Sequence, residues 1–410
     1  LCANTEGLNN TAIGHLALRL NSTADNNTAV GFQSLCANTT GTSNVAVGAN
    51  ALKLNTTLSD NTAVGHEALC TVATGGYNTA VGSKALRVNT TYWNTAIGFE
   101  ALCDTTSGST NTAVGARAMC DNTVGCNNVA VGYGTMSKNT EGENNTALGQ
   151  GSLTKNTTAD NNTAVGTTAL ACNTTGANNT AVGKDALIAN TTGSSNVAVG
   201  KNTLDANTTG GCLTALGQGA LGVNIEGDFN TAVGQAALGA NTTADGNTAV
   251  GRLALGANTT GNQLVAVGCG ALAANTTGGC NTAVGKDAML ANTTGANNAA
   301  VGQASLDSNT EGNSNVAMGR NSLASNTTAG NNTGIGAFSL EQNSTGTGNT
   351  AVGQLSLNRN TTASNNTAVG RQALETNTTG TQNVAVGNES LGSNTEGNYN
   401  VAVGRLALYE

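Results

Sequence analysis

Residues Asn27–Gly31 read Asn-Thr-Ala-Val-Gly, and variants of this phrase recur through the whole chain. The sequence holds 24 copies between Asn10 and Gly404, and successive copies begin 17 residues apart. The one exception is the step from Asn78 to Asn94, which is 16 residues. A short repeat of this kind indicates an array of stacked units in place of several independent domains. We therefore expect residues 1–410 to form a single uninterrupted array, and we number each repeat from its first Asn as position 1.

The consensus repeat is Asn-Thr-Ala-Val-Gly-x-x-Ala-Leu-x-x-Asn-Thr-Thr-Gly-x-x. Its glycines, asparagines and threonines are poor in helix interiors, whereas its β-branched residues favour short strands. Units this small bury a core only by stacking on one another. The sequence predicts an all-β fold, a parallel β-solenoid (β-roll or β-helix) of about 24 coils with 17 residues per coil. We expect strands at positions 2–4 and 8–10 and an extended segment at positions 12–14.

Equivalent positions of successive coils form columns, and the variability of a column indicates whether it is core or surface. Position 4 (Val30) and position 9 (Leu35) are apolar in every copy, so we expect both columns to line the core. Position 6 varies freely and includes His15 and His66, so positions 6 and 7 should face solvent. Position 3 is Ala in every copy except Gly334, which predicts either a narrow coil interior or a chain packed closely against that column.

Asparagine at positions 1 and 12 predicts two ladders of side-chain amides, each donating to the next coil about 4.8 Å away. Leu213 and Leu264 interrupt the first ladder, and Val72 and Thr105 interrupt the second, so we expect local weak points there. The single short repeat lacks Gly at position 15. We expect its missing residue to be absorbed in a corner at Tyr92–Trp93, with the strand left intact.

Composition argues against several classes of protein. The 56 glycines do not fall at every third position, which excludes collagen, and the net charge of −8 argues against nucleic acid as a partner. No apolar run approaches 18 residues, so no membrane span is expected. The only histidines lie at a variable position, no carboxylate pair recurs, and there is no phosphate-binding loop, calcium-binding nonapeptide or metal-ligand spacing. We expect no enzymatic activity, no cofactor and no metal site.

Ten cysteines are present, and two of them occupy the same position of adjacent coils. Cys103 and Cys120 both fall at position 10 and could form a disulfide between neighbouring coils. The other cysteines are interpreted as free thiols that pack as small groups or, alternatively, as sites for bonds between chains.

Sequons for N-glycosylation recur at two positions of the repeat. At position 12 the Asn belongs to an expected inward ladder, which would exclude a sugar. Position 17 varies and is expected to be exposed. It supplies seven candidate N-glycosylation sites: Asn9, Asn26, Asn144, Asn161, Asn178, Asn331 and Asn365.

The phrase Asn-Thr-Ala-Val-Gly-x-x-Ala-Leu resembles the head repeats of trimeric autotransporter adhesins, which read Ser-Val-Ala-Ile-Gly-x-x-Ser/Ala. It is also similar to Asn-Thr-Ala-Val-Gly repeat arrays of bacterial surface proteins and phage tail-fibre-like proteins. The resemblance covers the entire chain, although adhesin heads use shorter coils. It implies a parallel β-roll, often with three chains side by side, on a cell or virion surface.

We expect a structural component of an extracellular fibre or surface appendage, a rigid shaft for display or adhesion on a cell or virion surface. Its expected partners are copies of itself, associated laterally or end to end, and glycans. The alternative is a binding module that recognises ice or a repetitive glycan, and ice binding would require two parallel files of outward threonine. Leu1 and Glu410 fall inside a repeat, so we expect a segment of a longer chain or fibre.

Overall fold

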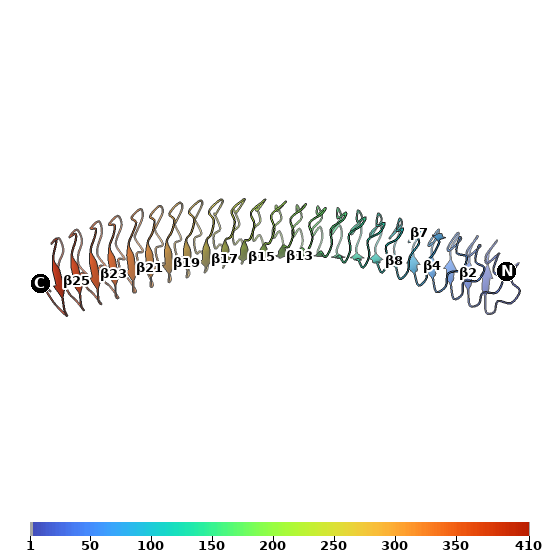
Figure 1. Ribbon diagram of the computed structural model, residues 1–410, viewed down its shortest axis with the longest axis horizontal. Coiled ribbons are helices and arrows are strands. Elements are labelled where there is room, and N and C mark those ends of the chain that lie inside the picture. The colour runs from blue at the N-terminus through green and yellow to red at the C-terminus, as the bar shows by residue number, and fades with distance from the viewer. Residues whose placement is uncertain (1–2, 410) are drawn as a thin grey trace. The chain divides into compact units, whose positions relative to one another are not determined.

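The computed structural model describes residues 3–409, which leaves Leu1, Cys2 and Glu410 outside the described part. It confirms an all-β parallel β-solenoid of about 23 turns with about 17 residues per turn, and no helix occurs among residues 3–409. Two compact units can be distinguished, Leu1–Thr209 and Gly210–Glu410. Within each unit the strands lie side by side in sequence order (Figure 1). The expectation of one uninterrupted array stays a prediction.

Each coil contributes one short strand, formed by positions 2–4 of the repeat. The strands of the first unit are β1 (Thr11–Ile13), β2 (Thr28–Val30), β3 (Val45–Val47), β4 (Thr62–Val64), β6 (Thr79–Val81), β8 (Thr95–Ile97), β9 (Thr112–Val114), β10 (Val129–Val131), β11 (Thr146–Leu148), β12 (Thr163–Val165), β13 (Thr180–Val182) and β14 (Val197–Val199). Those of the second unit are β15 (Thr214–Leu216), β16 (Thr231–Val233), β17 (Thr248–Val250), β18 (Val265–Val267), β19 (Thr282–Val284), β20 (Ala299–Val301), β21 (Val316–Met318), β22 (Thr333–Ile335), β23 (Thr350–Val352), β24 (Thr367–Val369), β25 (Val384–Val386) and β26 (Val401–Val403).

Alanine, and not valine, is the inward residue of each strand. Ala29 of β2 is 0 % exposed, whereas Thr28 and Val30 on either side of it are half-buried. Neighbouring strands pair in parallel with equivalent residues opposite each other, as Ala29 does with Ala46, so the column stays inward. The prediction that the column of Val30 lines the core is therefore wrong. Side chains alternate along a strand, and the narrow interior admits only the methyl group at position 3.

The rest of the coil is built from turns. The strand expected at positions 8–10 and the extended segment expected at 12–14 do not form within residues 3–409. Two further strands do occur at positions 11–12 of consecutive coils, β5 (Thr71–Val72) and β7 (Val88–Asn89), and they pair with each other in parallel. Backbone hydrogen bonds between coils nevertheless continue outside the strands. For example, the N–H of Leu187 donates to the carbonyl of Thr203 at 3.0 Å.

Left-handed backbone conformations at fixed positions shape these turns. In the coil that begins at Asn179, Asp185 (position 7) has φ 59°, Leu187 (position 9) has φ 52° and Ser195 (position 17) has φ 60°. Gly183 at position 5 has φ 137°, and a Cβ there would lie 2.4 Å from the carbonyl oxygen of the next coil's glycine. Both the positive φ and the close approach of the next coil require glycine at position 5, because a residue with a Cβ would be strained by the first and would clash in the second.

Leucine at position 9 combines backbone strain with complete burial. Leu187 is 0 % exposed, as are most of its equivalents. A left-handed conformation costs a residue with a Cβ roughly 1–2 kcal/mol, whereas burying a leucine side chain stabilises by about 1.5–3 kcal/mol. Burial therefore outweighs the strain, which explains why a bulky residue is retained in a conformation that usually selects glycine or asparagine.

The predicted amide ladder at position 12 is confirmed. Asn190 donates from Nδ2 to Oδ1 of Asn173 at 2.9 Å, and it accepts from Nδ2 of Asn207 at 2.9 Å. The same Nδ2 also donates to the carbonyl of Gly193 at 2.9 Å. All these asparagines are buried, so the position-12 sequons are enclosed.

The ladder at position 1 runs mainly through the backbone, which corrects the expectation of an amide-to-amide ladder. The backbone N–H of Asn179 donates to Oδ1 of Asn162 at 2.9 Å. Its own Nδ2 donates to the carbonyl of Gly193 at 2.9 Å. The carbonyl at position 15 thus accepts from both buried asparagines of its coil.

Interruptions of the repeat have local effects only. Val72 follows Asn55 in the position-12 column, and the buried Oδ1 of Asn55 has no hydrogen-bond partner among the described residues, as expected for a ladder gap. The short coil keeps its strand: β6 pairs with β8 in register, and Trp93 stacks on Tyr77 with ring centroids 6.5 Å apart.

The place predicted for the missing residue of the short coil is wrong, however. Tyr92 and Trp93 keep the backbone hydrogen bonds of positions 16 and 17. The carbonyl of Thr91 accepts from Asn78 and Asn89 as a position-15 carbonyl does, so the residue is lost between Thr90 and Thr91.

Truncation of Leu187 and of Val182 should separate the core column from the outward column. Leu187→Ala should destabilise its coil by about 2–5 kcal/mol, because it leaves a cavity in the core. Val182→Ala removes a half-buried side chain and should cost less than about 1 kcal/mol. Because repeat arrays open locally, hydrogen exchange of the amides in this coil is the suitable measurement. Equal effects of the two variants would contradict the observed register.

Replacement of Asn190 by aspartate tests the buried ladder. Asn190→Asp is nearly isosteric but removes both Nδ2 donors and places a carboxylate against two oxygens, so we expect a loss of at least about 3 kcal/mol. Asn178→Asp, at exposed position 17, is the matched control and should change stability by less than about 0.5 kcal/mol. Thermal unfolding followed by circular dichroism would compare the two variants, and similar melting curves would argue against the ladder.

Candidate functional site

The outward side of the strands forms a continuous uncharged surface within each unit, which we call the sheet face. It consists of the side chains at positions 2 and 4, and no copy of the repeat has a charged residue at either position. Position 4 presents valine, isoleucine, leucine or methionine to solvent, with Met318 42 % exposed. Position 2 presents mostly threonine. Contiguous exposed apolar surface of this extent is typical of interaction sites.

Position 6 lies at the exposed corner beside the sheet face. His15 and His66 are both exposed there, as predicted. His15 stacks on Phe32 of the next coil with centroids 5.7 Å apart, and Nε2 of His66 lies 3.9 Å from Oε1 of Glu67. Lys184 is likewise exposed. These side chains make only surface contacts, and they do not come together in one site.

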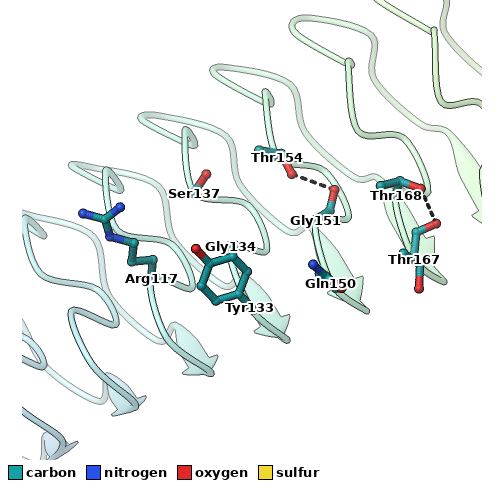
Figure 2. A pocket seen from close by; sticks show the side chains of 9 residues that line it. All are labelled: Arg117, Tyr133, Gly134, Ser137, Gln150, Gly151, Thr154, Thr167 and Thr168. Atoms are coloured by element: carbon teal, nitrogen blue, oxygen red, sulfur yellow. Dashed lines mark hydrogen bonds between the residues drawn. The ribbon is translucent and has the colours of Figure 1, made fainter.

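A groove crosses the first unit where two consecutive coils have glycine at position 7. It encloses about 360 Å³ and is floored by Gly134 and Gly151. Figure 2 shows Arg117 at one end of this groove, Thr168 at the other, and the ring of Tyr133 beside the floor. The remaining lining residues are Ser137, Gln150, Thr154 and Thr167.

The groove combines apolar surface with several polar groups and is nearly free of unbalanced charge. Arg117 is its only charged lining residue, and Nε of Arg117 donates to Oε2 of Glu100 at 3.1 Å. Tyr133 is 60 % exposed and offers an aromatic face, while Gln150 and the hydroxyls offer donors and acceptors. A hollow of this size can hold a small molecule, and its chemistry favours a neutral ligand with hydroxyl groups.

All seven candidate N-glycosylation sites at position 17 are exposed, from Asn9 to Asn365. Each has a left-handed backbone, with φ 60° at Asn26 for example, and asparagine tolerates this conformation well. The same positions therefore have a structural reason to be asparagine. Glycosylation itself stays a prediction.

Cys103 and Cys120 do lie together, with their Sγ atoms 3.0 Å apart in adjacent coils. Both are free thiols here, so the disulfide between them stays a prediction. The hydrogen bond between the two sulfurs raises the pKa of the Cys103 thiol and lowers that of Cys120, so Cys120 should ionise first. The carboxylate of Asp104 lies close enough that its oxygen and both sulfurs fall within 4.8 Å of one another.

Two signals for these sites were present in the sequence but were not used. The dipeptide Cys-Asp occurs at Cys103 and again at Cys120, one repeat apart, which places thiols and carboxylates in adjacent columns. Gly134 and Gly151 replace side chains in consecutive coils, and two absent side chains at one column indicate a hollow. The first signal does not show as a ligand spacing within one loop, because the residues that meet in a solenoid are one whole coil apart in the sequence.

No helix among residues 3–409 has the length and apolar character to cross a membrane. The sequence matches no known protein family, and no curated protein is detectably similar to it. The similarity to adhesin heads and tail-fibre arrays therefore stays a prediction.

Proposed function

We propose that this chain is a structural component of an extracellular fibre or surface appendage, a rigid shaft that associates with copies of itself. The sheet face carries this proposal, because it repeats an uncharged, partly apolar surface in coil after coil. A shaft requires stiffness and reach, and a rigid surface also suits display or adhesion.

Stiffness follows from the hydrogen bonds between coils. In the coil that begins at Asn179, the N–H of Thr180 bonds forward at 2.8 Å, and the N–H of Gly183 bonds back at 2.8 Å. The buried amide of Asn190 joins three coils. Bending such a stack would stretch the hydrogen bonds on the outer side of the bend.

A second copy is the partner whose chemistry fits the sheet face best. Positions 2 and 4 carry no charged residue that a partner would have to desolvate. Another copy presents the same side chains at the same axial interval, so contacts made at one coil recur at the next. Placement outside the cell is supported by the adhesin resemblance and by the exposed sequons at position 17.

Lysines on the sheet face should abolish self-association. Leu216→Lys with Val233→Lys places two charges at position 4 of adjacent coils, where a partner would have to desolvate them. Gln218→Lys with Gln235→Lys adds the same charge to position 6 of the same coils and is the matched control. In light scattering, the parent and the control should exceed the 40.2 kDa of one chain, whereas the face variant should not. A parent that stays monomeric at micromolar concentration would refute association.

A second candidate function, binding of a neutral glycan, is supported by the groove between Arg117 and Thr168. An exposed tyrosine ring matches the apolar face of a sugar, and the surrounding hydroxyl and amide groups match its hydroxyls. Ice binding is less well supported, because the sheet face has one file of threonine at position 2 beside an aliphatic file at position 4. We therefore favour a glycan as the ligand of the alternative function.

Filling the groove should remove glycan binding without disturbing the fold. Gly151→Gln is suitable because its Cβ would meet no atom nearer than 3.6 Å, and Gln33 already occupies position 7 with a left-handed φ. We expect Gly151→Gln and Tyr133→Ala to weaken binding to a panel of neutral oligosaccharides at least tenfold, measured by calorimetry. Gly219→Gln, in open space at position 7 of the second unit, should bind as the parent does. No binding by the parent, or equal binding by all variants, would reject this function.

A further inference from the structure

The cluster of Cys103, Asp104 and Cys120 is used neither by the sheet face nor by the glycan proposal. We propose that these three residues bind one thiophilic divalent cation, with Zn²⁺ as its representative. The proposal is independent of the shaft function, because it rests on the arrangement of the three ligand atoms alone.

The donor set fits a soft cation. Two sulfurs and one carboxylate oxygen lie within 4.8 Å of one another, and zinc in proteins is held by such ligands. With Zn–S bonds of about 2.3 Å, two sulfurs at tetrahedral positions are about 3.8 Å apart. The present separation of 3.0 Å is shorter. Stacked coils lie about 4.8 Å apart, so rotation of the two side chains can widen the gap without moving the backbone.

Asp104 distinguishes a metal site from a simple pair of thiols. A carboxylate contributes nothing to a disulfide, but it completes a set of three protein ligands around a cation. Three ligands leave a fourth position for water, as in open zinc sites. Cys120 also lines a hollow of about 220 Å³, shared with Arg117, Asp121, Ser137 and Lys138, through which an ion can enter.

The electrostatic surroundings can accommodate the ion. Asp104 of the cluster pairs with Arg87 at 3.2 Å. Two further ion pairs lie beside the cluster, Arg117–Glu100 at 3.1 Å and Lys138–Asp121 at 2.7 Å. Binding releases the two thiol protons, and the resulting thiolates balance the charge of a divalent cation. Affinity should therefore fall as the pH is lowered. Arg87 competes with the cation for Asp104, which is 49 % exposed.

The neighbouring coils provide a control. Cys70 also occupies position 10, but the adjacent coils carry Lys53 and Arg87 there, so it has no thiol partner in its column. Serine occupies the same position at Ser137, which shows that the coil accepts a hydroxyl in place of the thiol. Serine variants of Cys103 and Cys120 should therefore fold.

Titration of the full-length reduced chain with Co²⁺, a spectroscopic probe for zinc sites, tests the proposal. We expect sulfur-to-cobalt charge-transfer absorption that saturates at one equivalent and is displaced by Zn²⁺. Cys103→Ser and Cys120→Ser should each lower the affinity at least a hundredfold, and Asp104→Asn at least tenfold. Cys70→Ser should leave the affinity unchanged. Arg87→Ala should raise it, because Asp104 then has no competing guanidinium.

Three results would overturn the proposal. The first is absence of the charge-transfer band in the reduced parent chain. The second is equal affinity in the parent and in Cys103→Ser, which would assign the ion to other thiols. The third is an unchanged affinity in Asp104→Asn, which would leave a pair of thiols without a carboxylate ligand. Circular dichroism of each variant confirms that a lost band does not reflect unfolding.

Discussion

The coil depends on one interior oxygen, the carbonyl at position 15. A coil with a single three-residue strand sends most of its backbone through turns, and turn carbonyls that point inward cannot reach water. At Gly193 the oxygen accepts from the amides of both Asn179 and Asn190. Aspartate would lack the donors, and glutamine would be longer than the interior allows. Asparagine is therefore favoured at both positions. The few coils that lack one of the two amides still form, and these are the coils with Leu213, Leu264, Val72 and Thr105.

Much of the fold could be predicted from the repeat alone. Recurrence at a fixed step predicted the solenoid. The nearly constant residue types in the columns of Leu35 and Asn38 predicted that both columns face inward, and both residues are buried. The column of Val30 is apolar in every copy, yet it faces outward. A column can keep one residue type because it forms a surface as well as because it lies in the core. Side chains alternate between the two faces of a strand, so only the middle residue of each three-residue strand points inward. The small size of Ala29 indicates that it is this inward residue. The left-handed turns at positions 7 and 9 left no sign in the sequence, since bulky leucine fills one of them.

The candidate sites were predictable to different degrees. Cys103 and Cys120 were brought together by position alone, because equivalent residues of adjacent coils must stack. The role of Asp104 needed its oxygen to be placed relative to both sulfurs. The groove depends on side chains that are missing at Gly134 and Gly151, and its depth is set by the rotamers of Arg117 and Tyr133, which no pattern of residue types specifies.

The short coil between Asn78 and Asn94 shows how insertions and deletions are tolerated. One residue is lost in the turn segment at Thr90–Thr91, yet β6 and β8 still pair in register. Equivalent residues of neighbouring coils make equivalent contacts, so gain or loss of one whole coil would preserve every remaining bond. Misaligned recombination between such similar gene segments would thus yield folded products of different length. The length of the solenoid can therefore change in steps of one coil while its cross-section stays the same.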